Sequence, residues 1–326
     1  MSIGIIGGGV WGSALAKLFS SNQVTIYARD KKVVKSINEH HLNPVLKYVS
    51  FNQNVKATAS IEGIINNKYI FIALPTQSIR SVLEHDCFKD IKAHIIIASK
   101  GIEIETSSFL STLVEQLTNP LSVNVLSGPS FSDEVAQDLP TAVTFAATNK
   151  EVFDQLTSIV KGKNFRMYYS DDIIGSQIGG ALKNIYAIAA GISDGLNLGE
   201  NARSALITRS FVEMARFANF YKAKKETVFG LSGLGDLMLT CNSSKSRNTK
   251  FGIQVASTKL NTYEDLLDKN AITEGYYTIK ATKKISDTNK IEMPIMNAIY
   301  NILYKEHDIK EEIVQLMNRP PVEEKI

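Results

Sequence analysis

Cysteine is scarce in this chain, which has two cysteines among its 326 residues. Cys87 and Cys241 lie far apart in the sequence and form neither a CxxC pair nor a spacing typical of metal ligands. This usage favours a reduced, cytoplasmic setting over a secreted fold held by disulfides. The five histidines are also few, and none lies beside the polar clusters described below. We therefore expect no bound metal, and no histidine stands out as a general base.

Net charge and long apolar runs are equally limited. Lys+Arg 36 against Asp+Glu 33 leaves a formal charge of +3, so we expect no basic surface that binds nucleic acid. No run of about 18 apolar residues occurs, and the chain starts in a strand pattern without a signal segment. We expect neither secretion nor a membrane span. A length of 326 residues exceeds what one hydrophobic core usually serves and predicts two domains.

A glycine motif stands between a strand pattern and a helix pattern near the start of the chain. The segment "IGIIGGGVWGSALAKLFS" places Gly7, Gly9 and Gly12 in a GxGxxG spacing. Such glycines allow a tight turn, close approach of a pyrophosphate and close packing of the helix on the strand. The helix N-terminus then offers unpaired N–H groups to the phosphates. The motif predicts a dinucleotide-binding unit.

Charged residues follow the second expected strand, "QVTIYARD". At this point a dinucleotide-binding unit meets the adenosine ribose, where an acid favours NAD and an arginine accommodates the 2′-phosphate of NADP. Arg29 is followed here by Asp30, Lys31 and Lys32. The pattern leaves NAD and NADP both open, and a solvated charged turn is the alternative interpretation.

Further apolar runs at 68–75, 93–101 and 122–131 alternate with stretches long enough for crossover helices, and β-rich runs follow at 140–148 and 164–170. Apolar runs without alternation are typical of parallel strands covered on both faces. We predict a doubly wound α/β sheet, in which ligands bind at the carboxyl ends of the strands. Lys100 follows one such strand and could reach that edge, although a surface lysine is the alternative.

From about residue 175 the pattern becomes helical, and "GGALKNIYAIAAG" sets one lysine in an apolar helix. On a helix the neighbours of Lys183 are Gly179, Gly180, Ala187 and Ala190, all of them small. Small neighbours would leave room for a ligand. Alternatively, they would permit close helix packing while the ammonium extends to water.

A second polar cluster occurs in "FGLSGLGDLMLTCNSSKSRN". Asp236 and Thr240 are four residues apart and share one helical face. The polar residues that follow end in Ser246, Arg247 and Asn248. An arginine beside serine and asparagine donors suits a phosphate, because the guanidinium fork matches phosphate oxygens. A polar linker without a ligand is the alternative.

These segments together resemble the bacterial-type NAD(P)-dependent glycerol-3-phosphate dehydrogenases. The series "GGGVWGSALA", "SKGIE", "SGPSF", "GGALKN", "GENARSALITR", "GLSGLGDLMLTC", "SRN", "TEGY" and "MPI" occurs in the family's order over nearly the whole chain. The resemblance implies an N-terminal doubly wound Rossmann domain, which we place at 1–178, and a C-terminal all-α substrate domain at 179–326, with the active site between them. It also implies a homodimer that transfers hydride reversibly between NAD(P)H and dihydroxyacetone phosphate, giving sn-glycerol 3-phosphate for glycerophospholipids.

The resemblance further implies roles for individual residues. Lys183 looks like the proton-transferring lysine, and Asp236 and Lys100 look like its catalytic partners. The implied substrate-binding residues are Lys100, Gly128, Ser130, Asn184, Asp236, Thr240, Ser246, Arg247 and Asn248. The implied cofactor-binding residues are Gly7, Gly9, Val10, Trp11, Gly12, Arg29, Lys100, Ser132, Arg247, Ile272 and Glu274. Asp236 would raise the pKa of Lys183 while burial and Lys100 would lower it, and the sequence leaves that balance open.

Two residues depart from the family pattern: Val10 stands where many members have serine, and Glu200 stands where alanine is common. Neither touches the implied chemistry directly. Two other classes of protein also fit parts of the sequence. A 3-hydroxyacid or 6-phosphogluconate dehydrogenase relative would share the helix lysine, but "SKSRN" and "GLGDL" favour a small phosphorylated ketone. A nicotinamide-binding sensor would not need Lys183, Asp236 and Arg247 together.

Overall fold

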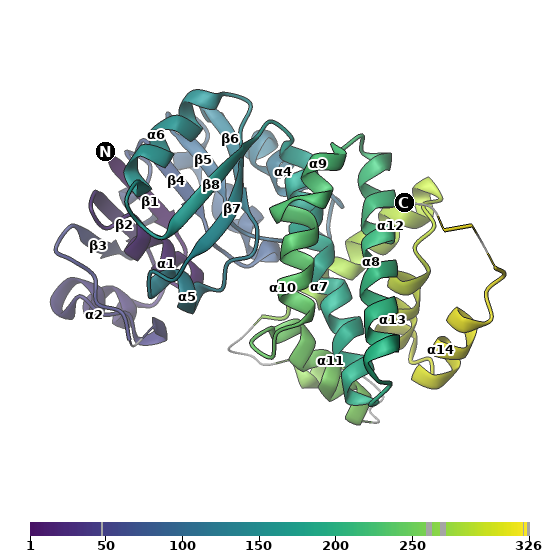
Figure 1. Ribbon diagram of the computed structural model, residues 1–326. Coiled ribbons are helices and arrows are strands. Elements are labelled where there is room, and N and C mark those ends of the chain that lie inside the picture. Colours follow the sequence, from purple (N-terminus) through teal and green to yellow (C-terminus); the bar gives the residue numbers. More distant parts are fainter. Residues whose placement is uncertain (47, 259–262, 268–271, 322, 325–326) are drawn as a thin grey trace. The chain divides into compact units, whose positions relative to one another are not determined.

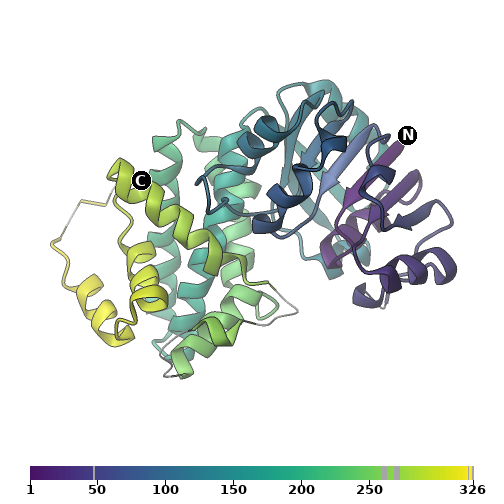
Figure 2. The same ribbon diagram turned by 180° about the vertical axis from the view of Figure 1, so that it is seen from behind.

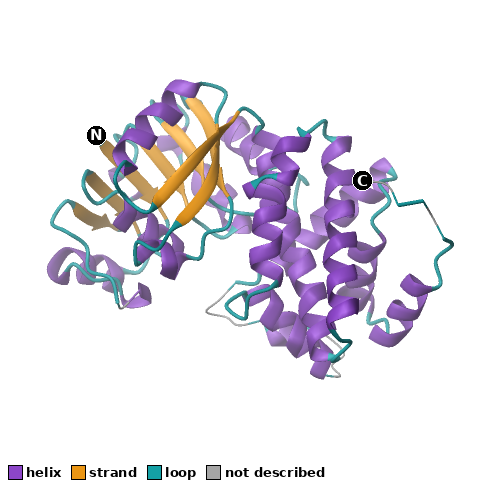
Figure 3. Ribbon diagram, viewed as in Figure 1, coloured by secondary structure: helices purple, strands orange, loops and turns teal. Residues whose placement is uncertain are grey.

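The structure, a computed structural model, describes residues 1–46, 48–258, 263–267, 272–321 and 323–324. The chain divides into two compact units, one formed by Met1–Ser99 with Leu110–Ile173 and the other by Lys100–Phe109 with Ile174–Ile326. The first unit mixes strands and helices, whereas the second is built from helices (Figure 3). This division differs from the expected boundary at 178/179, which falls within a single helix, and it assigns 100–109 to the helical unit.

An eight-stranded sheet forms the centre of the first unit. Its strands are β1 (Ser2–Ile6), β2 (Gln23–Tyr27), β3 (Val55–Thr58), β4 (Tyr69–Ile72), β5 (His94–Ile97), β6 (Ser122–Ser127), β7 (Thr141–Ala146) and β8 (Phe165–Ser170). They lie in the order β3-β2-β1-β4-β5-β6-β7-β8. The pairs from β3 to β6 are parallel, whereas β7 runs antiparallel to β6. The order reverses between β1 and β4, where doubly wound sheets bind ligands. The predicted doubly wound sheet is confirmed.

Helices cover both faces of this sheet (Figures 1 and 2). They are α1 (Val10–Leu18), α2 (Lys31–His40), α3 (Ile79–Leu83), α4 (Leu110–Leu117), α5 (Ser132–Ala136) and α6 (Lys150–Val160). Side chains of α1, α5 and α6 share one buried cluster with the sheet, and those of α3 and α4 share another. All four residues of β4 are buried, which explains why the strand shows no polar alternation.

The helical unit is arranged around one long helix. Its helices are α7 (Ile173–Gly195), α8 (Glu200–Phe220), α9 (Lys225–Phe229), α10 (Asp236–Cys241), α11 (Arg247–Ser257), α12 (Glu274–Asn289), α13 (Pro294–Lys305) and α14 (Ile309–Met317). In α7 every residue from Gly175 to Ser193 is buried, so the helix is enclosed on all sides. Lys183 lies near the middle of that buried stretch. Within the described residues, no helix combines the length and apolar character needed to cross a bilayer.

Candidate active site

The glycine motif forms a cradle at the start of α1. Gly7 has φ +131°, and a Cβ added there would lie 2.4 Å from the Ala73 carbonyl oxygen. A Cβ at Gly12 would lie 1.9 Å from the Gly7 carbonyl oxygen, so this turn requires glycine at both positions. Gly9 differs, because an added Cβ would meet no atom within 4 Å. Gly9 is also the N-cap of α1 and provides no side-chain cap. The free N–H groups of α1 therefore fit a dinucleotide pyrophosphate.

Other residues expected to bind cofactor or substrate also belong to the first unit. Trp11 donates from Nε1 to the Ala98 carbonyl oxygen at 3.0 Å, which links α1 to the segment after β5. Arg29 is exposed, whereas Asp30 accepts a hydrogen bond from the Lys32 N–H at 2.8 Å and caps α2. Beyond the carboxyl end of β6 lie Gly128, Ser130 and Ser132, and Val10 is 42% exposed.

A cluster of charged side chains lies in the helical unit. Lys183 Nζ is 2.5 Å from Asp236 Oδ1, and Lys100 Nζ is 2.5 Å from Asp236 Oδ2. Asp236 is completely buried. Thr240 Oγ1 accepts from Lys183 Nζ at 2.9 Å and donates to the Asp236 backbone carbonyl at 2.7 Å. One carboxylate thus contacts two ammonium groups, and the expected helical face shared by Asp236 and Thr240 is confirmed.

The protonation of Lys183 depends on opposing influences. Burial lowers the pKa of Lys183 to about 8, because the charged ammonium loses hydration. The Asp236 carboxylate opposes this shift, and the Lys100 ammonium adds to it. Burial therefore prevails in the balance that the sequence left open. A lysine with a pKa near 8 exchanges a proton readily close to neutral pH.

Close backbone packing explains why the residue four positions before Lys183 is a glycine. A Cβ at Gly179 would lie 2.0 Å from the Ser232 carbonyl oxygen. Ser232 belongs to a π-helical turn, Leu231–Gly235, which leads directly into Asp236. The idea that Gly179 leaves room for substrate is wrong, because the backbone of this turn fills that space. Gly179 instead lets the turn approach α7 and thereby brings Asp236 to Lys183.

The polar residues after α10 occupy the start of α11. Ser246 Oγ accepts from the Thr249 N–H at 3.2 Å and caps α11. Arg247 is exposed at the first position of that helix. Asn248 is buried, donates to Asn184 Oδ1 at 2.9 Å and accepts from the Gly275 N–H at 2.9 Å. Ser246 thus caps α11, Asn248 links α11 to α7 and to the first turn of α12, and Arg247 is exposed. Glu274 is the first residue of α12, and Ile272 lies two residues before it.

Two further charged residues of the helical unit were not identified from the sequence. Arg203 lies on α8 and hydrogen-bonds to residues 9, 38 and 39 positions away, so no local spacing could reveal its partners. Glu213 is buried on α8 and accepts from the backbone of Ile295 and Met296. The sequence indicated Arg203 only as an arginine within "GENARSALITR". The apolar residues around Glu213 gave no indication of its role.

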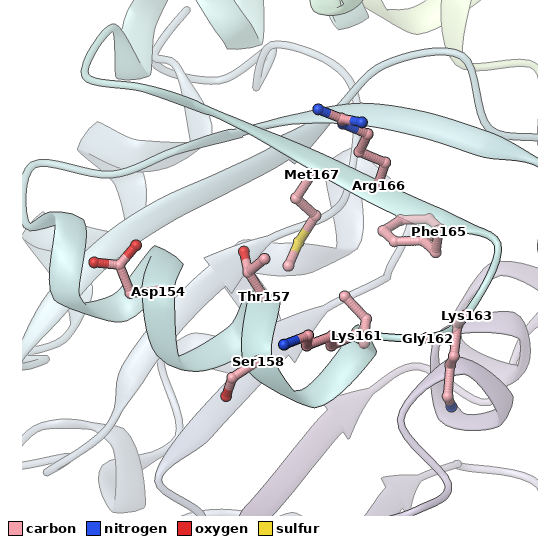
Figure 4. Close-up of a pocket in the computed structure, with 10 residues that line it drawn as sticks. Asp154, Thr157, Ser158, Lys161, Gly162, Lys163, Phe165, Arg166 and Met167 are labelled. Carbon is pink, nitrogen blue, oxygen red and sulfur yellow. The ribbon is translucent and has the colours of Figure 1, made fainter.

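A pocket of the first unit lies apart from all these residues (Figure 4). Its lining comes from α6, β8 and the turn between them: Asp154, Thr157, Ser158, Val160, Lys161, Gly162, Lys163, Phe165, Arg166 and Met167. Met167 points toward α6 in this view, whereas Arg166 points away from it. No residue that we assign to cofactor or substrate lines this pocket, so it is not part of the candidate site.

A dinucleotide cradle on a doubly wound sheet, together with a buried lysine and carboxylate in a helical unit, defines a nicotinamide-dependent dehydrogenase. Two family models match the chain: the NAD-dependent glycerol-3-phosphate dehydrogenase N-terminus over residues 2–153 and the C-terminus of the same family over 172–314. The chain belongs to the NAD-dependent glycerol-3-phosphate dehydrogenase family.

Individual relatives are similar over nearly their full length. Glycerol-3-phosphate dehydrogenase [NAD(P)+] of Erythrobacter litoralis is 38% identical over 322 residues, which cover 98% of this chain and 96% of that protein. The protein of the same name from a Thermotoga species is 40% identical, with coverage of 97% and 96%. The crystal structure of glycerol-3-phosphate dehydrogenase from Coxiella burnetii superposes with a TM-score of 0.90 at 33% identity, and covers 98% of this chain and 99% of that one.

Proposed function

We propose that this protein reversibly reduces dihydroxyacetone phosphate to sn-glycerol 3-phosphate with NAD(P)H, and that its product supplies the glycerophospholipid backbone. The observation that carries the proposal is the buried cluster of Lys183, Asp236 and Lys100. A carbonyl reduced by hydride needs one proton on its oxygen, and Lys183 is a buried donor whose pKa is about 8. Membership of the family supports the substrate and the cofactor.

Lys183 and the side chains around it have separate roles in proton transfer. Lys183 gives a proton from Nζ to the substrate oxygen during reduction and takes it back during oxidation. Asp236 holds the ammonium by a charge-assisted hydrogen bond, and Thr240 accepts a second one, so the donor is fixed in direction. Lys100 binds the other oxygen of Asp236. The positive charges of the Lys183 and Lys100 ammonium groups favour the negative charge that develops on the substrate oxygen.

The dinucleotide has a cradle of matching chemistry in the first unit. Gly7, Gly9 and Gly12 would admit the pyrophosphate to the free N–H groups of α1. When bound, the nicotinamide supplies or accepts the hydride. Arg29 is exposed beyond β2, while Asp30 is occupied as the cap of α2. We therefore assign the adenosine ribose end of the cofactor to Arg29.

Arg247 is the residue that we assign to the substrate phosphate. It is exposed at the first position of α11, and the fork of its guanidinium matches phosphate oxygens. Phosphate held there, away from the reacting carbon, supplies binding energy that positions the carbonyl. Ser246 and Asn248 support this site through the α11 cap and the Asn184 contact.

Replacement of Arg247 tests the substrate assignment. In Arg247→Ala the kcat/KM for dihydroxyacetone phosphate, measured from NADPH absorbance, should fall by a factor that corresponds to roughly 1.5 to 3 kcal/mol, the value of a hydrogen bond to a charged group. Arg247→Lys should recover only part of it, because an ammonium lacks the fork. Unphosphorylated dihydroxyacetone is the control substrate, since it has no group for Arg247 to bind. Equal proportional losses with both substrates would mean that Arg247 supports the fold or the cofactor instead.

We also propose that the protein works as a homodimer in the cytoplasm. The resemblance to the family supports the dimer, and the two cysteines, both free, support a reducing compartment. Light scattering of the purified protein at micromolar concentration should give twice the chain mass of 36.0 kDa. A mass equal to that of one chain would contradict the dimer.

A further inference from the structure

The Arg203 guanidinium donates hydrogen bonds to two helical segments of the helical unit, α7 and the end of α10. The side chain lies in the first turn of α8 and is 19% exposed. Its Nε donates to Asp194 Oδ1 at 2.7 Å, and Asp194 belongs to α7. Its Nη1 donates to Asn242 Oδ1 at 2.7 Å, and its Nη2 donates to the Cys241 carbonyl oxygen at 2.6 Å. Arg203 therefore joins α8 and α7 to the end of α10.

Helix α10 depends on such contacts, because it has only six residues. A helix shorter than two turns is not stable by itself in water. Its N-terminal end is held by the π-helical turn packed against Gly179. The carbonyl groups at its C-terminal end lack partners within the helix and form the negative end of the helix dipole. Arg203 donates to one of these carbonyls and places a positive charge beside them. Asn242 completes this end by donating from Nδ2 to the Met238 carbonyl at 2.9 Å.

The end held by Arg203 bears directly on Lys183. Asp236 is the first residue of α10 and Thr240 lies one turn later, so both move with that helix. Both contact Lys183, which is on α7, and Arg203 ties the other end of α10 to α7 through Asp194. Among the described residues, the charged groups that act on Lys183 are Asp236 and Lys100, and the Cys241 thiol lies nearby.

We propose that Arg203 is a positioning residue for proton transfer, which fixes the C-terminal end of α10 against α7 and so keeps Asp236 and Thr240 in hydrogen-bond contact with Lys183. The inference rests on the proposed function, because it requires Lys183 to move the proton. Arg203 touches neither Lys183 nor, in this proposal, the substrate. It acts through the geometry of α10 alone.

The proposal predicts a change in the pH profile, which a general loss of stability would not cause. If α10 loosens, the Asp236 carboxylate holds the Lys183 ammonium less tightly. Since that carboxylate raises the pKa of Lys183, weakening the contact lowers this pKa further. Reduction needs the protonated lysine, so its activity should be lost at a lower pH. Oxidation needs the neutral amine, so its activity should appear at a lower pH.

The experiment compares Arg203→Lys and Arg203→Ala with Arg209→Ala, a matched control six residues along the same helix. We expect kcat for dihydroxyacetone phosphate reduction to fall roughly 10- to 100-fold in Arg203→Ala, as a misplacement of about 1 Å can cause. Both pH limbs should shift to lower pH. Arg203→Lys should be intermediate because it keeps the charge without the fork, and added guanidinium should partly rescue Arg203→Ala. Arg209→Ala should resemble the wild type.

A second variant covers the case in which Arg203→Ala does not fold. Asp194→Asn removes the charge that faces Arg203 Nε but leaves the contact with the Cys241 carbonyl, so a smaller shift in the same direction is expected. Wild-type pH limbs in both Arg203→Lys and Asp194→Asn would overturn the proposal, as would a lower kcat with unchanged limbs. Failure of the proposed function is distinct: the wild type would then not reduce dihydroxyacetone phosphate, or Lys183→Ala would keep its turnover.

Discussion

The two units of this protein provide polar groups for ligands in opposite ways. In the first unit the donors are backbone N–H groups at the start of α1, and glycines keep side chains away from them. In the second unit the polar groups are ionised side chains, brought from segments 136 and 53 residues away from Asp236. The first kind of site is encoded within one short segment. The second exists only when distant segments fold together.

The same contrast appears at two helix N-termini. Helix α1 has no side-chain cap and no acidic residue in its first turn, so its positive end is available to a ligand anion. Helix α13 begins at Pro294, and the Glu213 carboxylate accepts from the Ile295 and Met296 N–H groups at 2.6 and 3.1 Å. That N-terminus is filled by the protein's own anion. A helix N-terminus therefore indicates a ligand only when the fold leaves it empty.

Replacing Lys183 should show the largest difference between the roles of the two units, because proton transfer is lost while cofactor binding remains. Lys183→Ala removes the proton donor, and kcat should fall by about 10² to 10⁴, the usual contribution of a positioned acid or base. Asp236 keeps Lys100 as its partner, so no charge is left buried and unpaired. The Kd for NADPH, measured by fluorescence titration, should stay near the wild-type value. Near-normal turnover in this variant would remove Lys183 from the mechanism.

The glycine cradle and the cluster of ionised side chains also differ in how well the sequence predicted them. The glycine cradle was predictable because its strand, turn and helix are contiguous, and Asp236 and Thr240 were predictable because helical spacing places them together. The contact of Lys100 with Asp236 was not predictable from spacing, since the resemblance alone grouped them. Strand β3 was missed: it has four residues at the sheet edge, and its exposed Lys56 suits an edge strand but gives no apolar run.

The buried carboxylate at α13 should make stability depend on pH. Burial raises the pKa of Glu213 from 4.5 to about 7, although the backbone N–H groups of Ile295 and Met296 and the Tyr186 hydroxyl oppose this. Below pH 4.5 the carboxyl is protonated in both states. Between these values the folded protein keeps a proton that the unfolded chain has lost. The free energy of unfolding should therefore fall as pH rises toward 7, by about 3 kcal/mol in all.

Glu213→Gln tests this dependence, because the amide does not titrate. Urea unfolding followed by circular dichroism should show that the stability of the wild type relative to the variant decreases between pH 5 and pH 8. Glu226→Gln, at an exposed position of α9, is the matched control. A stability difference that stays constant over this range would show that Glu213 keeps one charge state, and the filled N-terminus of α13 would then be a permanent ion site.

Within the first unit, Arg29 is the side chain that we expect to distinguish NADPH from NADH, since the backbone donors of α1 cannot. The two cofactors share a pyrophosphate and differ at the 2′-position of the adenosine ribose, where a guanidinium can bind a phosphate. Arg29 is exposed just beyond β2, and Asp30 is engaged with the Lys32 N–H. Arg29→Ala should raise the KM for NADPH by a factor on the order of ten, the value of one charge-assisted hydrogen bond, and change the KM for NADH little. Lys31→Ala, two residues further along, is the control for a general loss of positive charge. If the two Michaelis constants rise by equal factors, Arg29 does not read the phosphate, and the cradle alone sets the affinity for both cofactors.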